Sequence, residues 1–100
     1  YTAMAMEDIP ANAVKILLAH HPDFIKTATK YNADLVLSGH THGGQLGCLG
    51  IPLAPPVFKY MRGWYCEGNT ALYVHCGNGS WFPFRFGCPP EIAIFHLKNK

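Results

Sequence analysis

Three histidines are the residues of this 100-residue chain whose type and spacing point to chemistry. His20 ends a mostly apolar run (residues 14–20), and His40 follows a second apolar run (residues 34–38) and a glycine. His42 comes two positions after His40, and in an extended chain such side chains point to the same side. Neutral imidazole is a common ligand of zinc, iron and similar metals. The pattern therefore predicts a metal-binding site.

The elements around these histidines explain how they could meet. Short runs that are apolar on both faces are typical of buried parallel strands. Between them, Pro22 and Asp23 favour a helix start and Asn32 favours its end. Residues 14–40 are therefore expected to form a strand–helix–strand unit with a right-handed crossover. Parallel strands share their carboxyl edge, where α/β sheets bind ligands, so the histidine after each strand should lie there.

Two alternatives stay open at this point. His21 is a rival to His20 as the ligand, and the histidines could also be unrelated residues of a small domain. Gly39, Gly43 and Gly44 bracket the later pair. They are expected to allow positive φ values and a close approach to a ligand.

The remainder of the chain is punctuated by glycine and proline. Residues 41–56 are expected to form loops or short hairpins, and residues 61–70 a turn-rich segment. Residues 71–76 and 91–97 have strand patterns. The expected fold class is α/β with a mixed sheet.

Composition excludes several classes of protein. With 49% hydrophobic and 14% charged residues, the chain does not resemble a disordered tail. A net charge of +2 is too small to indicate a nucleic-acid surface, and no apolar run approaches the roughly 20 residues of a membrane span. The four cysteines form no C-x-x-C pair; disulfides stay open, although Cys76 lies in an apolar run that favours a buried thiol.

Two motifs carry a family resemblance: LLAHHPD (residues 17–23) and LVLSGHTHGGQLG (residues 35–47). They resemble the last two motifs of the calcineurin-like metallophosphoesterases. The GHTHGGQ string is similar to the bacterial branch that contains envelope phosphodiesterases and UDP-diacylglucosamine pyrophosphatases. Residues 59–65, 72–79 and 85–92 resemble the closing segments of that branch. The resemblance implies a two-sheet sandwich flanked by helices (α/β/β/α), of which residues 1–100 would be the C-terminal part.

The resemblance also implies a chemistry. Two divalent ions (Mn, Zn, Fe or similar) would activate water for attack on a phosphoester or a lipid-linked pyrophosphate, with His20 and His40 on one metal and His42 on the other. The early family motifs D-x-H, G-D-x-x-D and G-N-H-[DE] are absent from this chain. We therefore expect a fragment that lacks the N-terminal half of its domain, including the histidine that assists the leaving group, and that is inactive alone. A non-catalytic metal-binding or protein-interaction module is the alternative.

Further residues are secondary candidates. Arg85 and Gln45 could contact a substrate phosphate; alternatively, Arg85 would cover apolar surface with its stem and Gln45 would close the Gly-Gly turn. Thr41 and the neighbouring glycines would shape the loop, and Asp23 could orient a ligand or serve the helix start. An aromatic segment at residues 81–86 could form a lip for an acyl chain or a membrane surface, or belong to the core. The resemblance suggests the bacterial envelope as the location, and no nucleic-acid partner is expected.

Overall fold

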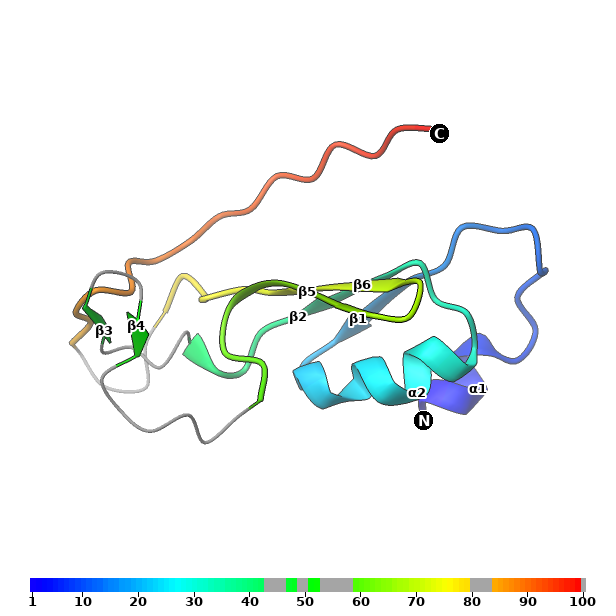
Figure 1. Ribbon diagram of the computed structural model, residues 1–100, viewed down its shortest axis with the longest axis horizontal. Helices are drawn as coiled ribbons and strands as arrows, with labels where there is room; N and C mark the ends of the chain where they lie inside the picture. The colour runs from blue at the N-terminus through cyan, green and yellow to red at the C-terminus, as the bar shows by residue number, and fades with distance from the viewer. Residues whose placement is uncertain (43–46, 49–50, 53–58, 80–83, 100) are drawn as a thin grey trace.

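The computed structural model describes residues 1–42, 47–48, 51–52, 59–79 and 84–99 (Figure 1). The elements, in chain order, are α1 (Thr2–Met6), β1 (Ile16–Ala19), the 3₁₀ turn η1 (Pro22–Phe24), α2 (Ile25–Lys30), β2 (Leu35–Ser38), β3 (Gly47–Cys48), β4 (Ile51–Pro52), β5 (Gly63–Glu67) and β6 (Thr70–Val74). Among the described residues, no helix has the length and hydrophobicity that crossing a bilayer requires.

A mixed sheet of four strands, in the order β1-β2-β6-β5, forms the centre of the chain. Strands β1, β2 and β6 are parallel, and β5 is antiparallel to β6. Strands β3 and β4 form a separate short antiparallel pair. The expectation of an α/β fold with a mixed sheet is confirmed.

The predicted strand–helix–strand unit is present and has the expected ends. The 3₁₀ turn begins at Pro22 and leads into α2, which ends at Lys30. Asn32 follows with a φ of +54°, a left-handed conformation that asparagine tolerates well. Its N–H donates to the Thr29 carbonyl at 3.1 Å, so the last turn of the helix is closed. The chain then enters β2 parallel to β1.

The hydrophobic core lies between the sheet and α2, because one face of each carries small or branched apolar residues. Ile25 and Ala28 of the helix are fully buried against a cluster that includes Val36, Leu72 and Val74 of the two central strands. Figure 1 shows both helices on the same side of the sheet. The sheet therefore has one face covered by helices.

The expectation of a turn-rich segment at residues 61–70 is wrong, because the structure places β5 there. Its residues alternate between half-buried and exposed, the pattern of a strand with one covered face. Glu67 pairs with Thr70, so Gly68 and Asn69 form a two-residue hairpin turn. Gly68 has a φ of +57°, which this kind of turn requires. The pattern predicted turns throughout residues 61–70, whereas the structure has a tight turn at Gly68 and Asn69 that joins two strands.

The expected strand at residues 91–97 is extended but has no strand partner among the described residues. Phe95 packs on the sheet, with its ring centroid 5.1 Å from that of Tyr73 and 5.8 Å from that of Trp64. Ile92 and Ile94 point away and are 85% and 80% exposed. Figure 1 shows this segment on the side of the sheet opposite the helices. Alternating apolar residues give an extended chain, but only a neighbouring strand makes it part of a sheet.

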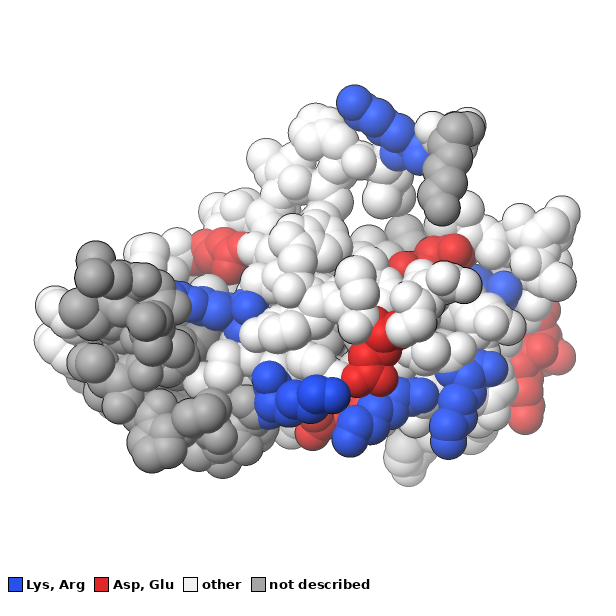
Figure 2. All heavy atoms as spheres, viewed as in Figure 1, with Lys and Arg blue, Asp and Glu red and all other residues white. Residues whose placement is uncertain are grey.

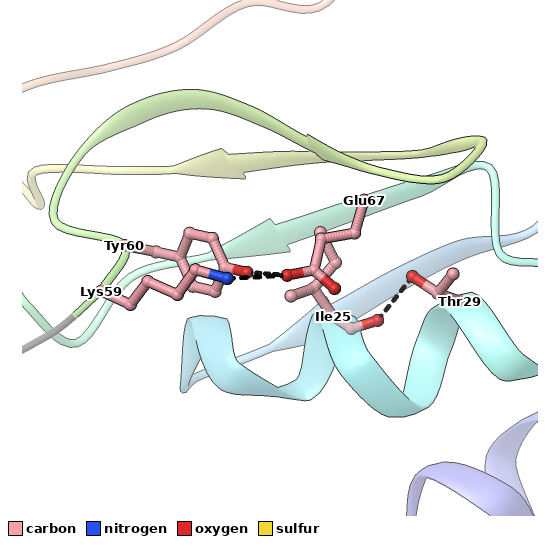
Figure 3. A network of polar contacts seen from close by, with 5 residues as sticks. All are labelled: Ile25, Thr29, Lys59, Tyr60 and Glu67. Carbon is pink, nitrogen blue, oxygen red and sulfur yellow. Dashed lines mark hydrogen bonds and ion pairs between the residues drawn. The ribbon is translucent and has the colours of Figure 1, made fainter.

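Surface charges are interspersed on the face seen in Figure 2, where basic and acidic side chains alternate. The best-defined group joins the segment before β5 to the last residue of that strand. Tyr60 donates its hydroxyl to Glu67, and the Lys59 ammonium lies 3.1 Å from the same carboxylate oxygen (Figure 3). Below them, the Thr29 hydroxyl donates to the Ile25 carbonyl at 2.8 Å within α2.

We expect Leu72→Ala to lower the free energy of unfolding by about 2–5 kcal/mol, because it opens a cavity in the centre of the core. Ile94→Ala is the control, since an 80% exposed side chain should change that free energy by less than about 0.5 kcal/mol. Urea denaturation followed by circular dichroism measures both. Equal losses for the two variants would contradict the assignment of the core.

We also expect Glu67→Gln to destabilise the chain at neutral pH but not in acid. Hydrogen bonds from Tyr60 and then from Lys59 lower the pKa of Glu67 below its ordinary value. The carboxylate therefore contributes stability above the unfolded-state pKa, and that contribution is lost as the pH falls below about 4. Melting temperatures of wild type and variant should differ at pH 7 and converge near pH 3. The exposed Glu7→Gln is the control, and a Glu67→Gln difference that persists unchanged at pH 3 would contradict the proposed cause.

Candidate functional site

The parallel pairing of β1 with β2 brings His20 and His40 into contact. Ala19 pairs with Ser38 at the carboxyl ends of the two strands, so the residues that follow leave the sheet side by side. One more main-chain hydrogen bond continues the ladder, from the Gly39 N–H to the His20 carbonyl at 3.2 Å. As a result, His40 Nδ1 lies 3.1 Å from His20 Nε2.

This separation fits two ligands of one metal ion. With metal–nitrogen bonds of about 2.0–2.1 Å, nitrogens this far apart subtend an angle of about 100° at the metal, between octahedral and tetrahedral values. Within the described part of the chain, however, no group of three or more histidine, cysteine, aspartate or glutamate side chains is arranged to hold a metal. These residues therefore supply a pair of nitrogen donors rather than a complete metal site.

His21 belongs to the same cluster. Its ring centroid lies 3.9 Å from that of His40 and 5.3 Å from that of His20. Both His20 and His21 are exposed. The structure thus keeps both within reach of His40, while the nitrogen-to-nitrogen contact is made by His20.

His40 is held in its uncharged form. Burial, followed by repulsion from His21, His20 and His42, lowers the pKa of His40 below its ordinary value. A neutral imidazole keeps a nitrogen lone pair available, which is the state that binds metal.

The loop after β2 turns at the histidines themselves. Gly39 was expected to provide a positive φ, but it continues the strand ladder, and open space surrounds the position of its missing Cβ. The left-handed conformations fall instead on His40 (φ +68°) and His42 (φ +51°). Such conformations cost most residues about 1–2 kcal/mol, so the surrounding structure must maintain them. Gly43, Gly44 and Gln45 lie outside the described residues.

Thr41, between the two histidines, is an anchor of the loop. It is fully buried, and its hydroxyl donates to the Met61 carbonyl, while its N–H donates to the Gly39 carbonyl at 2.8 Å. Its side chain therefore fastens the loop to the segment that precedes β5.

Arg85 directs its guanidinium at main-chain oxygen atoms near the loop. Nε donates to the Cys88 carbonyl at 2.7 Å, and Nη1 donates to the Gly79 carbonyl. Nη2 donates to the carbonyls of Cys76 (2.7 Å) and His42 (3.2 Å). The contact of Arg85 with a substrate phosphate stays a prediction. Asp23 lies in the first turn of η1, where a carboxylate is favourable.

Two buried thiols complete this region, and the expectation for Cys76 is confirmed, since Cys66, Cys76 and Cys88 are all free. Burial raises the pKa of Cys76 to about 11. Burial also opposes ionisation of Cys88, but hydrogen bonds from Cys76, Arg85 and Arg62 outweigh it and lower the pKa of that thiol. The Cys88 thiol donates to the His42 carbonyl at 3.3 Å.

Glu91 has a role that the sequence left open. Its carboxylate accepts hydrogen bonds from the Cys76 N–H, at 2.9 Å, and from the Tyr73 hydroxyl. The Glu91 N–H in turn donates to the Gly77 carbonyl at 2.9 Å. These contacts fix the turn after β6, where the Gly77 N–H also donates to His75 Nδ1 at 2.8 Å. No periodic pattern could reveal them, because they join segments that meet only in the folded chain.

Comparison with known proteins identifies relatives over most of the chain. It is 47% identical over 88 residues to the uncharacterized metallophosphoesterase YkuE of Bacillus subtilis, covering 84% of this chain and 31% of that protein. It is 39% identical over 90 residues to the phosphodiesterase YaeI of Escherichia coli, covering 87% and 33%. A third relative, the UDP-2,3-diacylglucosamine pyrophosphatase LpxG of Chlamydia trachomatis, is 33% identical over 90 residues, covering 79% and 27%.

The chain thus spans only about a third or less of the length of these relatives. No family model and no solved structure matches it. The relatives nonetheless share one family name or its activities, and each match covers 79–87% of this chain. By its sequence, the chain is similar over most of its length to one part of bacterial proteins named metallophosphoesterase, phosphodiesterase and pyrophosphatase.

Proposed function

We propose that this chain contributes the histidine ligands of a divalent-metal phosphohydrolase, an enzyme that cleaves phosphoester or pyrophosphate bonds. The observation that carries the proposal is the 3.1 Å separation of His20 Nε2 and His40 Nδ1 at the ends of two parallel strands. That geometry occurs in a chain whose relatives are named metallophosphoesterases. His42 would serve a second metal ion, of the manganese, zinc or iron type.

The substrate class is proposed from the names of the relatives. One is a phosphodiesterase and another a UDP-2,3-diacylglucosamine pyrophosphatase. We therefore propose a phosphodiester or a lipid-linked pyrophosphate as the substrate. An acylated substrate would place the enzyme at a membrane surface, and the bacterial envelope is the location we propose.

Each residue would contribute in a definite way. His20 and His40 would present neutral imidazole nitrogens to one ion, and the lowered pKa of His40 favours the uncharged ring, which has one nitrogen lone pair available. The buried Thr41 would keep the two loop histidines at a fixed spacing. When bound, the metal supplies charge stabilisation for the phosphoryl oxygens and lowers the pKa of a coordinated water.

The remaining ligands would come from a segment that packs beside this sheet. Imidazole nitrogens alone do not form the carboxylate-bridged site that the family resemblance implies. Leu18 of β1 is 76% exposed and Ile16 is 41% exposed, and a pocket lined by both Ile16 and Leu97 opens beside them. We propose that the N-terminal half of the domain covers this apolar surface and completes a two-sheet sandwich.

A chimaera tests the ligand assignment. In it, this chain replaces the matched 88-residue region of the Bacillus subtilis relative. We expect Mn²⁺-dependent hydrolysis of bis-p-nitrophenyl phosphate that falls at least about 100-fold in His40→Asn and in His42→Asn, because asparagine tolerates the left-handed backbone but lacks the imidazole. The control is His96→Asn, an exposed histidine of the C-terminal segment. Full activity in both loop variants would refute the assignment.

The 100-residue chain by itself should show no turnover. Its described residues offer a pair of nitrogen donors rather than a full ligand set, so we expect hydrolysis indistinguishable from that of free Mn²⁺. Assaying the chain and the chimaera at equal concentration makes the comparison. A rate equal to that of the chimaera would contradict this expectation, whereas an inactive but correctly folded chimaera would favour a non-catalytic metal-binding or interaction module.

A further inference from the structure

We propose that Arg85 is a positioning residue that, together with Cys88, holds the main chain of His42 in its left-handed conformation and so sets the place of its imidazole ring. The inference rests on the proposed function in one respect, the role of His42 as a metal ligand. It assigns to Arg85 an action through His42 instead of a contact with substrate.

The contacts converge on a single carbonyl. The His42 oxygen accepts a hydrogen bond from Arg85 Nη2 at 3.2 Å and another from the Cys88 thiol at 3.3 Å. Both donors come from a segment more than 40 positions further along the chain. A carbonyl fixed by two distant donors cannot rotate freely, and this restricts the backbone of the residue that carries it.

The backbone of His42 needs such support. Its φ of +51° lies in the left-handed region, which residues with a side chain adopt only where the surroundings enforce it. The same arginine nitrogen also holds the neighbouring turn. Arg85 Nη2 also donates to the Cys76 carbonyl at 2.7 Å, next to Gly77. A Cβ atom added to Gly77 would lie 3.9 Å from His42 Nδ1, so this turn borders the ring.

The chemistry of the guanidinium explains why an arginine stands here. Its planar fork carries five N–H donors in a fixed arrangement, and Nε, Nη1 and Nη2 all reach main-chain carbonyls. A lysine has one nitrogen and could satisfy only part of this set. Arg62 also lies nearby: it donates through Nη1 to the Gly87 carbonyl at 3.3 Å and hydrogen-bonds the Cys88 thiol, so it supports the same donor.

The first measurement needs no metal. In the full 100-residue chain labelled with ¹⁵N-histidine, we expect Arg85→Lys and Cys88→Ala to shift the imidazole and amide signals of His42 and to leave those of His96 in place. Lys30→Arg and Cys66→Ala, both at exposed positions, are the controls, and they should leave His42 unchanged. Unchanged His42 signals in Arg85→Lys would overturn the proposal.

The second measurement uses the chimaera described above and Mn²⁺ alone as the probe. We expect Arg85→Lys to weaken Mn²⁺ binding about 10–100-fold and to lower kcat, with KM unchanged and with partial rescue at high Mn²⁺. A raised KM with unchanged Mn²⁺ binding would overturn the proposal in favour of a substrate contact. A lowered melting temperature with Mn²⁺ binding and kcat intact would make Arg85 a structural residue only and would overturn the proposal.

The two proposals fail separately. If His42→Asn retains full activity in the chimaera, His42 is not a ligand and the proposed function loses that assignment. The metal-free signals of His42 would still decide whether Arg85 positions it.

Discussion

The parallel pairing of β1 with β2 is the constraint on which the rest of this molecule depends. Its register sets Ala19 beside Ser38, and the Gly39 N–H extends the ladder to His20 by one further bond. A shift of one residue would turn the apolar residues of β2 away from α2 and separate the two histidines. The same pairing that encloses the hydrophobic core therefore also determines where the candidate metal ligands meet. Stability and site geometry have a common origin here.

A second set of contacts acts at the same edge of the sheet, and it is polar. Arg85 and Glu91 each bind main-chain groups of the turn after β6, and Arg85 also reaches His42. Thr41 fastens the loop from the other direction, through the Met61 carbonyl. The edge that carries the histidines is thus held by side-chain donors and acceptors on main-chain groups. This arrangement suits a loop whose left-handed residues have no regular secondary structure to maintain them.

The sheet is covered by helices on one side, and its edge strand β1 carries the exposed apolar residues Ile16 and Leu18. In the part of the chain that the structure describes, the nitrogen donors also lack the carboxylates that usually complete a site for two metals. The uncovered apolar residues and the missing carboxylate ligands both agree with the finding that this chain spans about a third or less of the length of its relatives. They support the proposal that one further segment supplies both the missing layer and the missing ligands.

The sequence by itself determined the strand–helix–strand unit, the approach of His20 to His40 and the family resemblance. Each depends on short-range pattern: apolar runs of strand length, a proline at the helix start, and motifs within a few residues.

The tertiary structure alone decided the rest. Residues 63–67 became a strand because β6 lies beside them, and residues 91–97 stayed unpaired because no neighbouring strand is present among the described residues. The left-handed turn fell on His40 and His42 rather than on Gly39, because Gly39 is held in the ladder. Arg85 and Cys88 met the His42 carbonyl only through folding, since contacts between segments more than 40 positions apart leave no periodic trace in a sequence.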